Sequence, residues 1–214
     1  MEMLLIRHGD PDYLHDTLTP KGHEEAARLA RWLADTPLDA LYQSPLGRAC
    51  ATCAYTAQIK GLTPVTLEWL REVGIRRGEL YLWNAPGPLF LGGDTLPGHE
   101  DWLEPAGAMP EGREQYLRVS QGMDALLATY GFQKEGHLYR VTASNPARIA
   151  LFAHHGMIVT ALSYLLHWPL PLIFVHTSIS PAGLTRLVME EHDGERGVLA
   201  QPKLLAFNSL AHLC

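Results

Sequence analysis

The sequence has few cysteines, no cluster of basic residues and no long apolar run, and each shortage excludes a class of protein. Its 214 residues include three cysteines, an odd number that rules out a disulfide framework and favours a reducing compartment. Seventeen basic and 23 acidic residues give a net charge of -6, which argues against a nucleic acid or an anionic membrane as the main partner. Apolar stretches such as 149–153 are far too short to span a bilayer, and no signal sequence precedes the first strand, so we expect a cytoplasmic protein.

Two of the cysteines form a C-x-x-C pair, which in other contexts indicates redox or metal chemistry. Cys50 and Cys53 lie on the apolar face of a predicted helix, and no second pair exists to complete a metal site. We therefore expect both thiols to pack in the core, and we expect neither a metal nor a cofactor.

The order of apolar patterns predicts one α/β domain that covers residues 1–214. Length and a hydrophobic content of 47% suit a single sizeable core. Strands that alternate with helices indicate a three-layer sandwich, with a mostly parallel sheet flanked by helices. The expected strands are 3–6, 38–42, 64–69, 148–153, 178–188 and 199–207. The expected helices begin at Pro20, after Ser44-Pro45, at Arg113 and at Ile158.

Residues from about 78 to 112 interrupt the alternation of strands and helices, and they contain many prolines and glycines and four aromatic residues. The aromatic residues are Tyr81, Trp83, Phe90 and Trp102. A long irregular insertion in a compact domain is usually a lid or a binding loop, and the aromatic residues argue against disorder. We therefore expect a lid that covers a ligand site.

Charged residues follow several of the predicted strands. Arg7-His8-Gly9 ends the first strand, Arg48 follows the second, Glu72 follows the third, and His155 follows the strand 148–153. Because open α/β sheets bind ligands at the carboxyl ends of their strands, we expect these side chains to converge there. A cation beside an imidazole is the pairing that an enzyme needs when it passes phosphate through a histidine.

The chain resembles the histidine phosphatase superfamily, the phosphoglycerate mutase-like proteins. The resemblance covers almost the whole chain, and its segments occur in the same order as in the family. These segments are Leu5-Ile6-Arg7-His8-Gly9, Leu18-Thr19-Pro20-Lys21-Gly22, Ser44-Pro45-Leu46-Gly47-Arg48-Ala49 with Thr52, Leu70-Arg71-Glu72 with Gly74, Phe152-Ala153-His154-His155-Gly156, and the tail Phe207-Asn208-Ser209.

This resemblance implies a role for each matching residue. His8 would be the nucleophile that takes the phosphoryl group, while Arg7, Arg48 and His155 would hold the phosphate oxygens. Glu72 would be the general acid, and Glu79 is the local alternative. Neighbouring side chains on a strand point to opposite faces, so we expect His155 to face the site and His154 to lie in the core.

The residues after Arg7-His8-Gly9 depart from the mutase pattern. Mutases of the family carry Glu-Ser or Glu-Thr and a nearby Trp-Asn, whereas this chain has Asp10-Pro11-Asp12-Tyr13. We therefore expect a metal-independent phosphomonoesterase that acts on a small organic phosphate. The alternatives are a phosphoglycerate mutase-type phosphoryl transferase, a phosphatase of phosphorylated proteins, and a catalytically silent member that binds a phosphorylated ligand. The sequence leaves the oligomeric state open, with a homodimer as one option.

Overall fold

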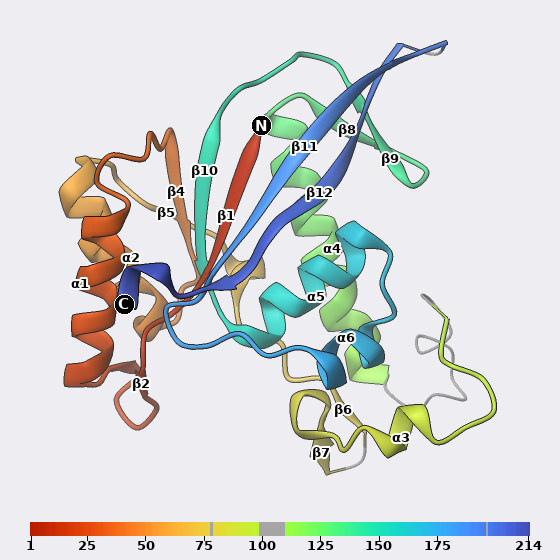
Figure 1. Cartoon of the computed structure of the whole chain (residues 1–214), viewed down its shortest axis with the longest axis horizontal. Helices are drawn as coiled ribbons and strands as arrows, with labels where there is room; N and C mark the ends of the chain where they lie inside the picture. Colours follow the sequence, from red (N-terminus) through yellow and green to blue (C-terminus); the bar gives the residue numbers. More distant parts are fainter. Residues whose placement is uncertain (78, 99–109, 196) are drawn as a thin grey trace.

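A central sheet separates two groups of helices (Figure 1). The structure is a computed structural model that describes residues 1–77, 79–98, 110–195 and 197–214. Within these ranges the large sheet has eight strands, which in spatial order are β5 (Val65–Thr66), β4 (Ala40–Gln43), β10 (Arg148–Ala153), β1 (Glu2–Arg7), β11 (Leu184–Gly194), β12 (Gly197–Ser209), β9 (Leu138–Val141) and β8 (Phe132–Glu135).

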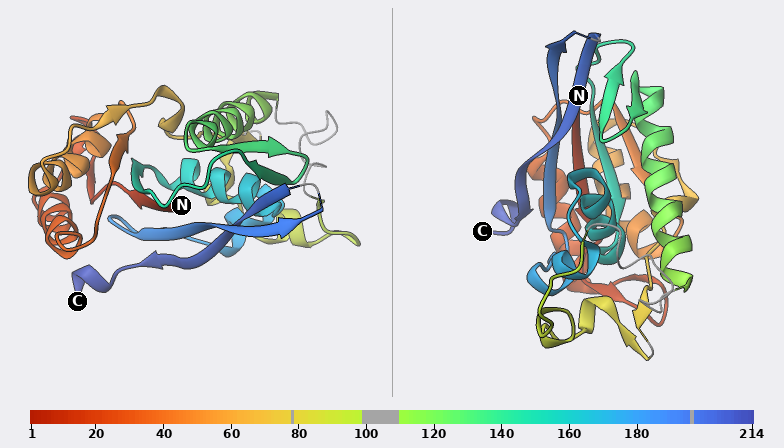
Figure 2. Two further views of the ribbon diagram at one scale, coloured as in Figure 1. Left: turned by 90° about the horizontal axis from the view of Figure 1, so that it is seen from above. Right: turned by 90° about the vertical axis from the view of Figure 1, so that its right-hand side faces the viewer.

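Six α-helices lie within the described residues, and all but one, Pro88–Leu91 in the predicted lid, lie in the layers beside the sheet (Figure 1). They are α1 (Pro20–Trp32), α2 (Gly47–Lys60), α3 (Pro88–Leu91), α4 (Pro110–Thr129), α5 (His155–Leu166) and α6 (Leu170–His176). Helices α1 and α2 lie on one side of β1 and β10, and α4 and α5 lie on the other (Figures 1 and 2). The predicted three-layer α/β class is confirmed. Among the described residues, no helix is long and apolar enough to cross a membrane.

The strand β1 is apolar on both faces because each face meets a helical layer. Leu4 and Ile6 belong to the apolar cluster under α1 and α2, while Met3 and Leu5 belong to the cluster under α4 and α5. All four side chains are at most 3% exposed. This double burial explains why the strand is a continuous apolar run rather than an alternating one.

The sheet is parallel on one side and antiparallel on the other. β5, β4, β10 and β1 run parallel to one another, so their carboxyl ends meet at one edge. β11, β12, β9 and β8 complete the sheet by antiparallel pairing. The β11–β12 hairpin extends past the start of β1 (Figure 1). The parallel strands are the ones that were predicted to carry the functional residues.

The described part of the predicted lid lies beyond the carboxyl edge of the sheet and contains short elements. They are the hairpin of β6 (Arg76–Arg77) and β7 (Leu80–Tyr81), a 3₁₀ turn at Leu82–Asn84, and α3. Leu82 is fully buried and anchors this segment to the core. Residues 78 and 99–109, with Trp102, lie outside the described residues.

Several local predictions differ from the structure, and two elements were not predicted. The strand expected at 178–188 begins only at Leu184 and continues to Gly194, and the helices expected from Arg113 and Ile158 begin at Pro110 and His155. Only Val65–Thr66 of the expected strand 64–69 pairs with β4, because the chain turns into a 3₁₀ helix at Glu68–Leu70. The hairpin β8–β9 was not predicted, since its strands have four residues each and turn at Gly136, which has a positive φ of 61°. The short helix α6 was also missed.

Of the two cysteines that were predicted to pack in the core, Cys53 is fully buried and Cys50 is only half-buried. Cys53 is buried in the cluster under α1 and α2, and burial raises its thiol pKa to about 12. Cys50 is half-buried, and its thiol donates a hydrogen bond to the carbonyl of Ser44 over 3.2 Å. Both thiols are free.

The loop that follows β1 presses against the first turn of α1. Thr19 caps this helix as predicted, since its hydroxyl accepts a hydrogen bond from the Gly22 amide. A Cβ added at Gly22 would lie 2.2 Å from the backbone oxygen of Asp10, and one added at Gly9 would lie 2.6 Å from the Gly22 oxygen. The backbones meet so closely that neither position has room for a side chain.

We expect Gly22→Ala to destabilise the protein by about 1–3 kcal/mol, because the added methyl overlaps backbone that cannot move aside. In an exposed helix the same change would stabilise by about 1 kcal/mol. Denaturant unfolding followed by circular dichroism measures the difference. Arg31→Ala, at an exposed position of the same helix, is the matched control and should stay within about 0.5 kcal/mol. A Gly22→Ala protein as stable as the wild type would contradict the close contact.

Candidate active site

His8 continues the backbone of β1 and is almost completely buried, with 1% of its surface exposed. Its Nδ1 lies 2.8 Å from the Gly9 carbonyl oxygen, which can only accept a hydrogen bond. Nδ1 must therefore carry the proton, and Nε2 keeps a free lone pair. Burial lowers the pKa of His8 to about 4, and the charges of Arg7 and Arg48 act in the same direction. At neutral pH the ring is uncharged and nucleophilic.

Arg48 lies in the first turn of α2 and covers the nucleophilic nitrogen of His8. Its Nε donates to His8 Nε2 over 3.3 Å, and its Nη1 forms a 2.6 Å ion pair with Asp16. The second carboxylate oxygen of Asp16 accepts a hydrogen bond from the Gly47 amide over 2.7 Å. Although burial opposes ionisation of Asp16, these two partners keep its carboxyl pKa below the usual value. Asp16 is therefore ionised, and its negative charge holds the Arg48 guanidinium in place.

Arg7 approaches the site from the end of β1. Its Nη1 donates to the Ile179 carbonyl over 2.5 Å, and its buried Nε has no hydrogen-bond partner among the described residues. A buried N–H without a partner is costly, and an anion in the pocket would supply an acceptor.

The two adjacent histidines at the end of β10 have different environments. His155 faces the pocket, and its Nδ1 accepts a hydrogen bond from the Ile179 amide over 3.3 Å, so that Nε2 carries the proton. His154 is fully buried, lies 5.1 Å from the His8 ring and bonds to the Ser44 hydroxyl over 2.8 Å. Burial lowers the pKa of His155 to about 4 and that of His154 to about 2. The structure thus places the two rings as the sequence predicted.

Glu72 lies opposite the arginines, and its carboxylate is tied to two backbone amides. Its Oε1 accepts hydrogen bonds from Val73 over 2.9 Å and from Met157 over 3.0 Å. Burial nevertheless raises the carboxyl pKa, against the opposing effects of these bonds and of the arginine charges. Glu79, the alternative acid, is exposed and does not line the pocket.

The helix α4 holds the segment that carries Glu72. Arg118 Nη2 donates to the carbonyls of Arg71 and Glu72, each over 3.1 Å. Gln115 Oε1 accepts a hydrogen bond from the Gly74 amide over 2.6 Å. The sequence analysis did not identify Arg118 or Gln115, because a helical pattern gives no sign of bonds to a loop more than 40 positions earlier.

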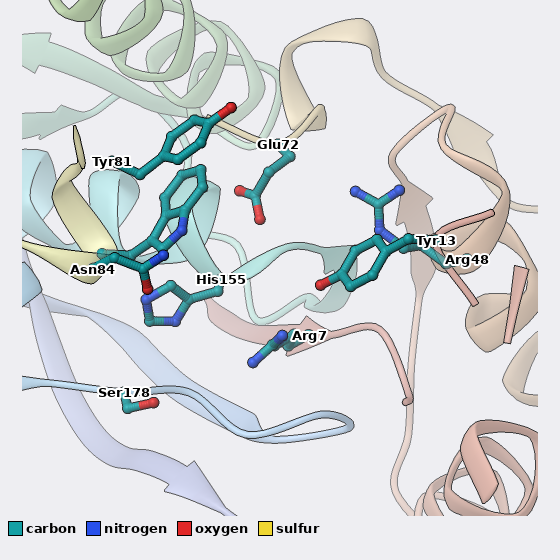
Figure 3. Close-up of a pocket in the computed structure, with 9 residues that line it drawn as sticks. Arg7, Tyr13, Arg48, Glu72, Tyr81, Asn84, His155 and Ser178 are labelled. Atoms are coloured by element: carbon teal, nitrogen blue, oxygen red, sulfur yellow. The ribbon is translucent and has the colours of Figure 1, made fainter. Parts of the chain in front are cut away.

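These side chains surround a pocket of about 500 Å³ at the carboxyl edge of the parallel strands (Figure 3). The lining residues are Arg7, Tyr13, Arg48, Glu72, Tyr81, Trp83, Asn84, His155 and Ser178. Four of the five predicted site residues line the pocket, and the fifth, His8, lies beneath Arg48. Tyr13, Asn84 and Ser178 were not predicted from the sequence, because they lie in loops and a short 3₁₀ turn whose paths no strand or helix pattern indicates. The aromatic pair Tyr81 and Trp83 comes from the predicted lid.

The comparisons confirm the resemblance to the histidine phosphatase superfamily. The family model of the histidine phosphatase superfamily (branch 1) matches residues 3–84. This segment contains four of the predicted site residues, and His155 lies beyond it. No curated protein sequence matches the chain.

Solved phosphatase structures resemble the chain over almost its whole length. One is a phosphoserine phosphatase from Entamoeba histolytica in complex with 3-phosphoglyceric acid, with a TM-score of 0.66, 21% identity, and coverage of 100% of this chain and 99% of that chain. Another is a mycobacterial glucosyl-3-phosphoglycerate phosphatase, with a TM-score of 0.66, 20% identity, and coverage of 97% of this chain and 98% of that chain. At these identities the likeness establishes a shared fold.

We expect the site histidines to make the fold sensitive to acid. The folded-state pKa values of His8, His154 and His155 lie near 4, 2 and 4, below the unfolded value of 6.5, so the unfolded state binds more protons as the pH falls. The free energy of unfolding should therefore decrease as the pH falls from about 6.5 to about 4, by up to roughly 1.4 kcal/mol per pH unit for each histidine. Denaturant unfolding at a series of pH values measures this slope.

The matched pair for this test is His154→Gln and His192→Ala. His154→Gln should reduce the slope, because it removes one buried ring that resists protonation. His192→Ala, in the exposed β11–β12 hairpin, should leave the slope unchanged. If His154→Gln kept the full wild-type slope, the histidines would not be its source.

Proposed function

Because residues 3–84 match the histidine phosphatase superfamily and the whole chain shares the fold of its phosphatases, we propose that this protein is a phosphomonoesterase. It hydrolyses a small organic phosphate through a phosphohistidine on His8. The observation that carries this proposal is the arrangement of four groups: a neutral imidazole whose Nε2 carries no proton, two guanidinium groups beside it, and a carboxyl group of raised pKa across the pocket.

In the first step, His8 Nε2 attacks the phosphorus atom and the bond to the leaving oxygen breaks. Glu72 is protonated at this stage, which its raised pKa favours, and it gives its proton to the departing alkoxide. The products are a free alcohol and a phosphohistidine. Arg48 Nε gives up its bond to His8 Nε2 and turns to a phosphate oxygen, so that the nitrogen is open for attack.

In the second step, water attacks the phosphorus atom and the N–P bond breaks. The Glu72 carboxylate takes a proton from the water, and neutral His8 and inorganic phosphate are released. Dividing the transfer into two steps replaces one difficult displacement by two easier ones.

Three donors stabilise the charge on the phosphoryl oxygens in both steps. Arg7 and Arg48 bring two guanidinium groups, and His155 offers its Nε2 proton, since Nδ1 already accepts a bond. Their partners hold them before the ester arrives, so little reorganisation is needed during the reaction. This charge comes from side chains alone, and the proposed reaction therefore needs no metal.

We expect His8→Ala to lower the hydrolysis of para-nitrophenyl phosphate in the presence of EDTA by about a thousandfold or more, because it removes the nucleophile. His192→Ala is the matched control. Rapid quenching in base, followed by mass spectrometry, should find a phosphorylated peptide that contains His8. Equal turnover by wild type and His8→Ala would disprove the mechanism. A wild type without turnover would instead support the silent, ligand-binding alternative.

We expect Glu72→Gln to reduce the hydrolysis of benzyl phosphate about 10²- to 10⁴-fold, and to affect para-nitrophenyl phosphate much less. A general acid matters most for a poor leaving group such as an alkoxide. In the wild type, kcat/KM should rise as the pH passes about 4, where His8 loses its proton, and should fall above the raised pKa of Glu72. Glu72→Gln should abolish the falling limb, and Glu79→Gln should retain it. Equal losses on both esters would contradict the role of Glu72 as the acid.

A further inference from the structure

The pocket extends well beyond the groups that would hold a phosphate. Arg7 and Arg48 lie on one side of it, Tyr81 and Asn84 lie on the other, and His155 lies between the two sides beside Asn84 (Figure 3); Trp83 lines the pocket as well. A volume of about 500 Å³ is in the range of sites that hold whole small molecules. The side of the pocket that Tyr81 and Asn84 line therefore faces the alcohol that the phosphate is attached to.

The aromatic side chains here form a wall through contacts with one another and with Arg76. Tyr81 and Trp83 are stacked, with ring centres 4.4 Å apart and planes 9° apart. The Arg76 guanidinium lies 4.0 Å from the centre of the Tyr81 ring and donates a hydrogen bond to the Tyr81 hydroxyl. Because Arg76 and Trp83 cannot occupy the same face of one ring, Tyr81 is held between them.

Backbone and core contacts fix this wall to the rest of the protein. Leu82, between the two aromatic residues, is fully buried, and its amide donates to the Ile75 carbonyl over 3.0 Å. Trp83 packs beside Gly156, where an added Cβ would lie 3.3 Å from the indole ring. A rigid aromatic wall binds an apolar ring without the entropic cost of ordering flexible side chains.

The charges of the described lining oppose an anionic alcohol. Its guanidinium groups, Arg7 and Arg48, both belong to the phosphate end, and Arg76 is stacked on Tyr81 outside the lining. The other polar groups at the far end are neutral, namely Asn84 and Ser178. Glu72 becomes a carboxylate once it has given up its proton, and it would repel a carboxylate on the departing alcohol.

We propose that the Tyr81–Trp83 wall is the binding site for the leaving group, and that it selects phosphate esters of uncharged alcohols that carry a flat or ring-shaped apolar part. The ring packs against Trp83, which is itself stacked on Tyr81, and Asn84 and Ser178 offer hydrogen bonds to its polar edge. This proposal deepens the proposed function and rests on it for the position of the phosphate.

The first test compares benzyl phosphate with propyl phosphate, whose alcohols are similarly poor leaving groups. The wild type should prefer the benzyl ester in kcat/KM, and Trp83→Leu should lower this preference about tenfold, with Trp83→Phe intermediate. Trp168→Leu, an exposed tryptophan outside the pocket, is the matched control and should keep the wild-type preference. If Trp83→Leu lowered kcat/KM equally for the two esters, Trp83 would not select the ring.

The second test compares two esters of similar size that differ in charge. Glycerol 3-phosphate should be hydrolysed with a higher kcat/KM than 3-phosphoglycerate, which carries a carboxylate. A clear preference for 3-phosphoglycerate would overturn the expected neutrality of the alcohol.

Binding measurements separate this proposal from the proposed function. Calorimetry with benzylphosphonate and propylphosphonate, which cannot be hydrolysed, should show tighter binding of the benzyl compound to the wild type and a smaller difference in Trp83→Leu. If no ester is hydrolysed but this difference persists, the binding site stands and the phosphatase proposal fails. If esters are hydrolysed and the two phosphonates bind equally well, the leaving-group site fails alone.

Discussion

The parallel pairing of β1 with β10 is the constraint on which the site depends. The two strands are in register to their ends, with Arg7 opposite Ala153, and the His8 amide continues the ladder by donating to the Ala153 carbonyl over 3.0 Å. This pairing brings Arg7 and His8 beside His154 and His155, although nearly 150 positions separate them. A shift of one residue would turn every side chain of β1 to the opposite face, away from the cluster it now packs in. The apolar residues of β1 thus determine both the core and the position of His8.

A second layer of contacts fixes the loops around this strand end. Gly9, Gly22 and Gly47 each lie against the backbone of another segment, closely enough that a Cβ would overlap it. The Gly9 amide also donates to the Thr52 hydroxyl over 3.0 Å, which ties the loop after His8 to α2. Glu72 is held in a comparable way by α4 and by the first turn of α5. The groups of the site are therefore positioned by the packing of the backbone, and their side chains need little freedom to reach the pocket.

The sequence was sufficient to predict those features that follow from strand position. Arg7, His8, Arg48 and His155 could be placed together because they lie at or just after the ends of parallel strands, which meet at one edge. Glu72 reaches the same edge after a 3₁₀ helix rather than directly after a strand. The choice of His155 over His154 came from the resemblance, since both residues lie beyond the end of β10. Residues that act through loop geometry could not be predicted in this way. Ser178 and Asn84 line the pocket only because of the paths of their backbone segments. The hydrogen bonds of Arg118 and Gln115 with the segment that carries Glu72 cannot be predicted from a helical pattern. Asp16 likewise lies in a loop, and its ion pair with Arg48 depends on the path of that loop.

The contact between Arg48 and His8 links the two groups on which the proposed first step depends. Burial and two neighbouring cations keep His8 uncharged, and a neutral Nε2 is the natural acceptor for the Nε proton of Arg48. A phosphate dianion is a far stronger acceptor for a guanidinium than a neutral imidazole is. Binding of the ester would therefore draw Arg48 from the nitrogen to the phosphate oxygens and expose the lone pair when the phosphorus atom is in reach. Asp16 keeps hold of Nη1, so this movement needs only a turn of the guanidinium group about an anchored end. In the proposed mechanism, the same arginine would therefore exchange its bond to His8 for bonds to the phosphate oxygens.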